Sequence, residues 1–465
     1  MIRQLALASI LIAAGQSADW TTHRGGAARP GTVDGQPGPA KPKVLWTHKS
    51  SEHYVASLVA SGDRLFVPAL GAFNTGVFHA MDLADGAAKR IVWSKSAPLL
   101  RVPAVCAPAV VEGKLFLGEG MHQTDGAGLL CIRVSDGRLL WRLNATGNLV
   151  HMEGSPTVAG GRVYIGAGSG GVYCVDTTSV TLEGREVTIA EVEKKNDAKW
   201  KELSEKYEAE KKKDPDFAIP PSEMSLPQAS PKVWWQQGQG QWHVDGPTAV
   251  AEGKVLAGSA YLDVEKLGKR SLFCMSADDG KILWEAPLKF NPWGGPTVAG
   301  GLVFVSCSSI RYDPQAIKGA QGEIVALKLA DGSVAWRKDI DAGALGSVAV
   351  AGNLAIFTDT GGHVRAFDVR NGTQTWISSG ATPYFAGPVV AKDAVYVANL
   401  KGGVAAIKLA DGKTIWELDA AGAAGSPGMI YGSPILHRGR IYVGTANLEG
   451  DSAGKPTFLT CIGGE

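Results

Sequence analysis

Three histidines occupy nearly the same place in a repeating pattern of this chain, and two of them have an acid two residues later. His151 is followed by Glu153 and His243 by Asp245, while His53 shares the register of His151. Imidazole and carboxylate groups together bind a transition metal or Ca²⁺, and either can act as a general base. Their spacing is not a metal signature, so rim polar residues and hydrogen-bonded core histidines remain alternatives. The candidate metal ligands are His151, Glu153, His243 and Asp245.

Aromatic residues and one arginine fall in the same loops as these histidines. Such a rim suits a peptide or a ring-shaped ligand, and the alternative is that the rings plug the centre of the fold. No residue is assigned a catalytic role. The candidate binding residues are His53, Tyr54, Arg101, His151, Glu153, Trp242, His243, Asp245, Trp293, Tyr384 and Tyr431.

The elements that position these residues are predicted by a repeat of the form Asp-Gly-x-x-x-Trp. It runs from Asp136 to Trp141, Asp279 to Trp284, Asp331 to Trp336 and Asp411 to Trp416, with an Asn-Gly version ending at Trp376. An Asp-Gly pair between two β-type runs indicates a tight hairpin. A hairpin repeated at a fixed period indicates an array of one sheet unit.

A second hairpin, with a glycine-containing turn, follows most of these tryptophans by about twenty residues, as in 154–165, 295–305 and 432–443. Each unit therefore has four strands, A to D, which is typical of a β-propeller blade. The segment 43–46 is a strand D without a strand C, and 458–462 is a strand C without a strand D. Together they complete one blade and bring the predicted count to eight. The loops from D to A and from B to C should share one face, where we expect the candidate residues to lie around the channel mouth.

The third blade contains an insertion, 177–231. Thr188 and Glu191 form a capping-box pattern for a helix, and a proline-rich stretch leads back to the sheet. The helical face with Ile189, Val192, Trp200, Leu203 and Tyr207 is expected to pack on the propeller; the alternative is a docking arm for a partner. The expected fold is therefore an all-β, eight-bladed β-propeller of four-stranded antiparallel blades, spanning 43–465, with an extended segment at 19–42 and a helical insertion in blade 3.

Composition narrows the classes of function. A formal net charge of +1 argues against nucleic acid as a partner. Residues 1–18 have the basic start, short apolar run and small residues of a secretory signal peptide. We expect an exported periplasmic or extracellular protein, monomeric, without a transmembrane segment and without the cysteine of a lipid anchor. The six cysteines mostly fall in small interior positions, so buried thiols are expected, with a Cys106–Cys131 disulfide as the alternative.

The run from Ala366 and Asp368 through Gly372 to Trp376 resembles the tryptophan-docking motif of the quinoprotein-type (PQQ-like) propellers. This resemblance extends over nearly the whole chain outside the insertion. The resemblance implies that the chain belongs to one of two branches of these propellers. The catalytic branch oxidises alcohols or sugars with pyrroloquinoline quinone and Ca²⁺, and many of its members have adjacent cysteines, which this chain lacks. The other branch resembles the propeller scaffold of the outer-membrane barrel-assembly machine, which binds proteins.

We therefore expect a scaffold that binds a protein or peptide in the cell envelope, with no cofactor. The alternatives are a quinone- or metal-dependent oxidoreductase, using pyrroloquinoline quinone and Ca²⁺, and a binder of a small ligand or carbohydrate at the aromatic rim.

Overall fold

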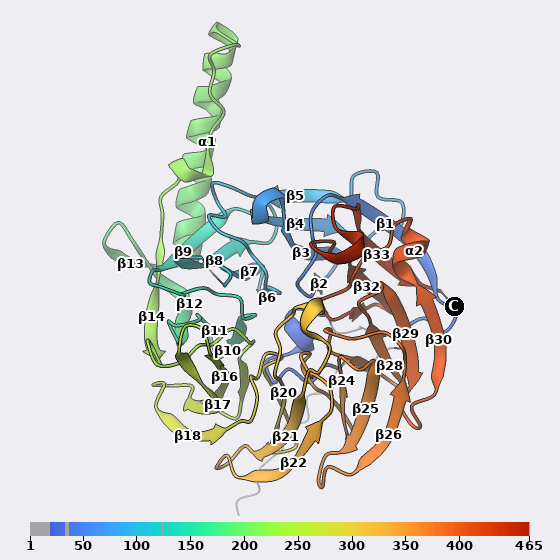
Figure 1. The fold of residues 1–465 in the computed structure, drawn as a ribbon. Coiled ribbons are helices and arrows are strands. Elements are labelled where there is room, and N and C mark those ends of the chain that lie inside the picture. The colour runs from blue at the N-terminus through green and yellow to red at the C-terminus, as the bar shows by residue number, and fades with distance from the viewer. Residues whose placement is uncertain (1–18, 33–36, 123, 465) are drawn as a thin grey trace, which may run out of the picture.

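The computed structural model describes residues 19–32, 37–122 and 124–464, and in them the chain forms a ring of eight four-stranded antiparallel sheets (Figure 1). The predicted fold class is confirmed. The predicted signal peptide at 1–18 lies outside the described residues. In the described part of the chain, no helix is long and apolar enough to cross a membrane.

The first four blades follow the chain from the N-terminal side. Their strands are β2 (Val59–Ser61), β3 (Arg64–Leu70), β4 (Gly76–Asp82) and β5 (Ile91–Lys95) in blade 1; β6 (Ala109–Val111), β7 (Lys114–Glu119), β8 (Ala127–Arg133) and β9 (Leu139–Ala145) in blade 2; β10 (Thr157–Ala159), β11 (Arg162–Gly166), β12 (Val172–Leu182) and β14 (Ser230–Gln237) in blade 3; and β15 (Ala249–Ala251), β16 (Lys254–Leu262), β17 (Leu267–Ser276) and β18 (Ile282–Pro287) in blade 4.

The other four blades complete the ring. Their strands are β19 (Pro296–Ala299), β20 (Leu302–Ser308), β21 (Gly322–Lys328) and β22 (Val334–Ile340) in blade 5; β23 (Ala349–Ala351), β24 (Leu354–Thr358), β25 (His363–Asp368) and β26 (Gln374–Ser379) in blade 6; β27 (Val389–Ala391), β28 (Ala394–Ala398), β29 (Gly403–Lys408) and β30 (Thr414–Asp419) in blade 7; and β31 (Ile435–His437), β32 (Arg440–Gly444), β33 (Thr457–Gly463) and β1 (Lys43–Ser50) in blade 8.

Blade 8 is built from both ends of the chain, as predicted. Strand β1 pairs antiparallel with β33, from Lys43 opposite Gly463 to Ser50 opposite Thr457. The ring is therefore closed by backbone hydrogen bonds, and no radial strand edge is left open. A short helix, α2 (Ala420–Ala424), lies between blades 7 and 8.

The repeated tryptophan joins neighbouring blades. The indole N–H of Trp284 donates to Leu329 O (3.1 Å) and that of Trp336 donates to Val369 O (2.8 Å), each in the next blade. The glycine of the next blade's C–D turn lies flat on the same ring: a Cβ on Gly332, where φ is +72°, would be 2.6 Å from Trp284. Asp-Gly and Trp therefore recur together because the turn of one blade needs a residue without a side chain against the indole of the blade before it.

The N-terminal segment fills the centre of the ring and covers the inner strands (Figure 1). Its carbonyl groups, from Trp20 to Gly31, accept backbone N–H groups from the innermost strands of six blades: Ala60, Val110, Val250, Val298, Val350 and Val390. Blade 3 is contacted by the fully buried Arg29 instead, whose guanidinium donates to Ser155 O (3.0 Å) and Pro156 O (2.9 Å). This short segment thus satisfies strand edges that would otherwise face the channel.

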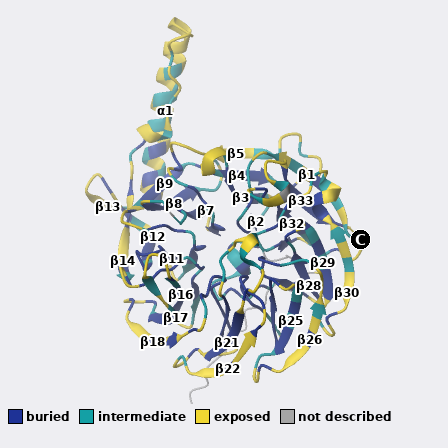
Figure 2. Ribbon diagram, viewed as in Figure 1, coloured by how far each residue is buried: buried dark blue, intermediate teal, exposed yellow. Residues whose placement is uncertain are grey.

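The insertion in blade 3 forms β13 (Arg185–Thr188) and α1 (Ile189–Lys213), and the helix projects from the outer side of the ring (Figure 1). The capping box between Thr188 and Glu191 is present. The expectation that the whole apolar face packs on the propeller is wrong. Only Ile189, Val192 and Asn196 of α1 are buried, and the helix becomes exposed toward its end (Figure 2).

All six cysteines are buried free thiols, so the alternative of a Cys106–Cys131 disulfide is wrong. The Cys106 thiol donates to Gly118 O (3.4 Å), and burial raises its pKa to about 12. In strand β8, Cys131 occupies an interior position and behaves as a small apolar residue.

Candidate functional site

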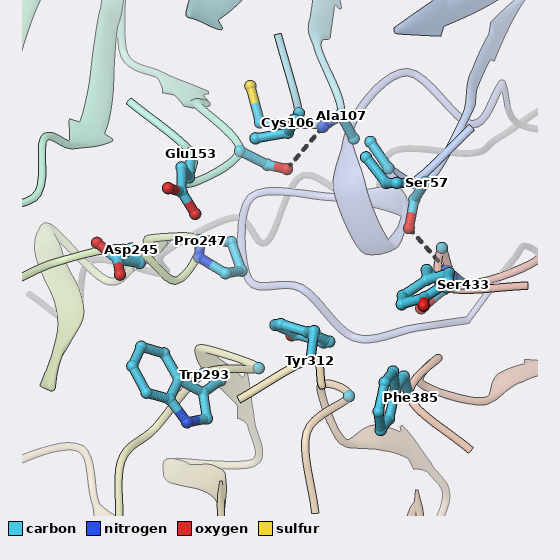
Figure 3. A pocket seen from close by; sticks show the side chains of 18 of the residues that line it. Ser57, Cys106, Ala107, Glu153, Asp245, Pro247, Trp293, Tyr312, Phe385 and Ser433 are labelled. Carbon is cyan, nitrogen blue, oxygen red and sulfur yellow. Dashed lines mark hydrogen bonds between the residues drawn. The ribbon is translucent and has the colours of Figure 1, made fainter. Parts of the chain in front are cut away.

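A cavity of about 480 Å³ opens at the centre of one face of the ring. All eight D–A loops contribute to its walls, together with B–C loops of blades 2, 5 and 8. The sequence places its candidate site on this face. The lining includes Ser57, Cys106, Glu153, Asp245, Trp293, Tyr312, Phe385 and Ser433 (Figure 3).

Hydrogen bonds between neighbouring D–A loops hold the walls together. The hydroxyl of Ser155 accepts the backbone N–H of Ala107 (3.1 Å), and the hydroxyl of Ser57 accepts that of Ser433 (2.9 Å) (Figure 3). Each of these bonds crosses from one blade to the next. The cavity is therefore shaped by the ring itself rather than by mobile side chains.

One wall of the cavity is aromatic. Phe385 packs edge-on against Tyr312 (ring centroids 5.8 Å apart) and at a tilt against Tyr431 (5.6 Å). The guanidinium of Arg311 lies over the ring of Trp293, 5.3 Å from its centroid. This wall offers flat apolar surface for a ligand.

At the edge of the same cavity, three histidines and an aspartate from neighbouring blades meet. His122 comes from the B–C loop of blade 2, and His151 and His243 from the D–A loops that lead into blades 3 and 4. The ring centroids of His151 and His243 are 5.1 Å apart, and His122 lies 5.6 Å from His151. One ligand atom from each of these histidines and from Asp245 can be chosen so that all lie within 4.8 Å of one another.

The ionisation of this cluster follows from its burial. Burial lowers the pKa of His151 to about 4, so its imidazole is neutral at neutral pH. Burial, and then repulsion from Asp245, raises the pKa of Glu153 well above its usual range. Burial opposes the ionisation of Asp245, but attraction to His243 and then His151 outweighs it and lowers that pKa. The two acids therefore differ: the pKa of Asp245 lies below its usual range and that of Glu153 lies above it.

The structure brings together only part of the predicted set. Glu153, Asp245, Trp293 and Tyr431 line the cavity, with His151 and His243 buried beside them. The other five residues lie outside the cavity lining.

Each of these five is engaged in the fold. The Nδ1 of His53 accepts Asn447 N–H (3.0 Å), and Trp242 stacks on Phe273 with ring centroids 3.8 Å apart. Tyr54 and Tyr384 belong to hydrophobic core clusters, and Arg101 is exposed beside Asn144.

His122, Arg311 and Tyr312 were missed by the sequence reasoning. All three lie in B–C loops, whereas the candidates were taken from D–A loops alone. The prediction that both kinds of loop share one face contained the signal: His122 follows strand B of blade 2 at the same level as the histidines of the D–A loops.

A family model described as outer membrane protein assembly factor BamB matches residues 38–200, 225–315 and 311–450. The chain belongs to this family. The BamB of Yersinia pestis is 26% identical over 212 residues, which cover 42% of this chain and 49% of that protein. The tetrathionate hydrolase of Acidithiobacillus ferrooxidans is 23% identical over 399 residues, or 77% of this chain and 66% of that enzyme. The chain thus matches about half to two thirds of the length of these relatives.

Among solved structures, the quinohemoprotein alcohol dehydrogenase of Comamonas testosteroni superposes with a TM-score of 0.65, covering 96% of this chain and 81% of that enzyme. The sequence identity is 14%, so this likeness shows the fold alone.

The cavity is a poor fit for the quinone and Ca²⁺ of the dehydrogenases. Ca²⁺ takes six to eight oxygen ligands, whereas the cluster offers three imidazoles and one carboxylate. Pyrroloquinoline quinone has three carboxyl groups, and Glu153, Asp245, Asp313 and Glu449 line the same cavity. We therefore derive no quinone chemistry for this chain.

Proposed function

We propose that this protein is a binding scaffold of the cell envelope that engages a partner protein through the helical arm of blade 3. The observation that carries the proposal is the apolar end of that arm: Phe217 and Ile219, just beyond α1, are 81% and 80% exposed. Exposed apolar residues at the end of a projecting element contribute nothing to the fold and suit an apolar groove on another protein.

The base of the arm is held firmly. Asp197 of α1 accepts hydrogen bonds from Arg133 (2.9 Å) and Arg138 of blade 2, and Arg138 also lies 4.9 Å from the ring centroid of Trp200. On the return segment, Glu223 pairs with Lys95 of blade 1. The arm therefore points in a fixed direction, which lowers the entropic cost of binding a partner.

The length of the arm supports the same role. At 1.5 Å per residue, a 25-residue helix is about 37 Å long. Beyond the first turns its side chains are mostly charged and solvated, from Lys201 to Lys213. A helix that stands out this far reaches a partner well clear of the ring. Membership of the family of outer membrane protein assembly factors supports the proposal that the partner is a protein of the cell envelope.

A photo-crosslinking residue at position 217 tests the proposal in the native envelope. Phe73 is the matched control, because it is also a highly exposed phenylalanine and lies between strands of blade 1, away from the arm. We expect one defined envelope protein to crosslink from 217, to be weakened by Ile219→Ser, and not to crosslink from 73. The same products from both positions, or none from 217, would refute the arm as the binding element.

A second candidate is binding of a small ligand, favoured by the aromatic wall. The cavity volume falls within the usual range for ligand pockets, roughly 300–1,000 Å³. A carbohydrate or aromatic ligand would stack on Tyr312, which is 43% exposed, beside Trp293. Quenching of tryptophan fluorescence by such a ligand, lost in Trp293→Phe, would support it; quenching that persists in this variant would place the ligand elsewhere.

A further inference from the structure

We propose that His122, His151, His243 and Asp245 form a binding site for one divalent transition-metal ion, with Zn²⁺ as the best fit, at the edge of the central cavity. The proposal does not depend on the scaffold role of the arm. Three imidazoles and one carboxylate are the donors that zinc and its neighbours prefer, and they come from three loops that no sequence motif links.

The strongest observation is the state of His151. Its side chain is fully buried, and neither ring nitrogen has a hydrogen-bond partner among the described residues. The nearest acceptors of its Nδ1 are Glu153 Oε1 at 3.2 Å and Asp245 Oδ1 at 3.7 Å, neither in hydrogen-bonding geometry. Buried polar groups are rarely left unpaired, because each costs stability. A metal ion would satisfy one of these nitrogens.

The other ligands also have unused capacity. His122 Nδ1 and His243 Nδ1 are buried without a partner in the described part of the chain, and so is Asp245 Oδ1 by hydrogen-bond geometry. His243 Nε2 is only 2.9 Å from Asp245 Oδ1, so this pair is already assembled. Glu265 competes weakly with a metal ion for His122, because its Oε1 lies 3.5 Å from His122 Nε2.

The backbone is fitted closely around the imidazoles. A Cβ on Gly168 would be 2.9 Å from His151 Nε2, and one on Gly120 would be 3.0 Å from His151 Cα. A Cβ on Gly268 would be 3.0 Å from His243 Cβ. Because these glycines have no side chain, the loops can approach the histidines closely. The surrounding backbone therefore restricts the positions of His151 and His243.

The geometry requires only a small contraction. Zinc–ligand bonds of about 2.0–2.1 Å place tetrahedral ligand atoms about 3.3 Å apart. One ligand atom from each of the four residues can be chosen so that all of them already lie within 4.8 Å of one another. His122 and Asp245 line the cavity, so the ion would be reachable from it, whereas His151 and His243 would hold it from behind.

The test is a zinc titration of the purified full chain, carrying no histidine tag and stripped with a chelator. We expect one ion per chain. His122→Ala and Asp245→Asn, at the partly exposed ligands, should each weaken binding by about 100-fold or more, because each removes a direct ligand. His79→Ala is the matched control, because His79 is buried and pairs with Glu52 (2.7 Å) outside the cluster. This variant should bind zinc as tightly as the wild-type chain does.

A second measurement needs no variant. Loading the wild-type chain with Co²⁺ should give the strong visible absorption of a tetrahedral site, and Zn²⁺ should displace it. The proposal is overturned if the wild-type chain binds no zinc, if binding survives the ligand substitutions, or if Co²⁺ gives only the weak spectrum of the hydrated ion.

Discussion

The contact between each C–D turn and the preceding indole predicts that Gly332 and Gly301 differ in their tolerance of alanine. Both have positive φ, +72° and +75°, but a Cβ on Gly301 meets no atom within 4 Å, whereas one on Gly332 meets the ring of Trp284. Left-handed backbone costs alanine about 1–2 kcal/mol, and the lower entropy of the unfolded chain returns about 0.4–1 kcal/mol. Gly301→Ala should therefore lower the free energy of unfolding by about 1 kcal/mol.

Gly332→Ala carries an additional cost. Displacing the Trp284 ring costs about 1–3 kcal/mol in packing, and losing its bond to Leu329 O costs about 1 kcal/mol. With the backbone cost of about 1 kcal/mol, we expect a total of about 3–5 kcal/mol. Urea unfolding measures the difference; in a chain of this length each kcal/mol also lowers Tm by about 1 °C.

A double-mutant cycle isolates the contact. In a Trp284→Ala background the ring is absent, so Gly332→Ala should cost no more than Gly301→Ala does. Equal costs for the two glycine substitutions in the wild-type background would refute the idea that the turn glycine exists to dock the indole.

Three further predictions concern the centre of the ring and the thiols. Arg29 donates to six acceptors, whereas a lysine has only three donors. Arg29→Lys should therefore lower the free energy of unfolding, measured in urea, by about 3 kcal/mol or more. The control Arg438→Lys, at an exposed arginine, should lower it by less than about 0.5 kcal/mol. Burial, and then the charges of Arg29 and Arg24, lower the pKa of His23. The stability that this residue contributes is therefore present above about pH 6.5 and lost as the pH falls. His23→Gln should reduce the loss of stability at acid pH, and an unchanged loss would contradict a role of His23 in it. The five thiols other than Cys106, which lines the cavity, should resist a thiol reagent in the native protein, and all six should react in denaturant; early labelling of these five would contradict their burial.

The fold was predictable because the repeat expresses a contact between neighbouring blades that recurs around most of the ring. A turn glycine on an indole requires a fixed pair of residue types at a fixed distance, so the pattern is visible without coordinates. The closure of blade 8 followed from an unpaired strand at each end of the pattern. The role of residues 19–31 in covering the inner strands was not predictable from the sequence. Their backbone carbonyl groups accept the N–H groups of those strands, and every residue type has such a carbonyl group.

The candidate site was predictable only in part, for a related reason. Register within the repeat placed His151 and His243 correctly side by side, but it also selected His53, which lies in a loop of another sector and bonds to Asn447. His122 follows a different strand and belongs to no repeated position. Contacts across neighbouring blades depend on loop shape, which the periodic part of the sequence does not contain.

Two features of blades 2 to 4, the insertion and the histidine cluster, have no counterpart in the repeat, and this bears on function. Two strand-D tryptophans, Trp46 of blade 8 and Trp141 of blade 2, have no hydrogen-bond partner for the indole N–H in the described chain, unlike Trp284 and Trp336. The return of the insertion occupies the neighbourhood of Trp141: Ala229 forms a bridge with Trp141 and accepts the N–H of Arg142 (3.1 Å). The histidine cluster lies on loops of the same blades, 2 to 4. An arm and a histidine cluster in the same sector of the ring are features that stability alone does not explain.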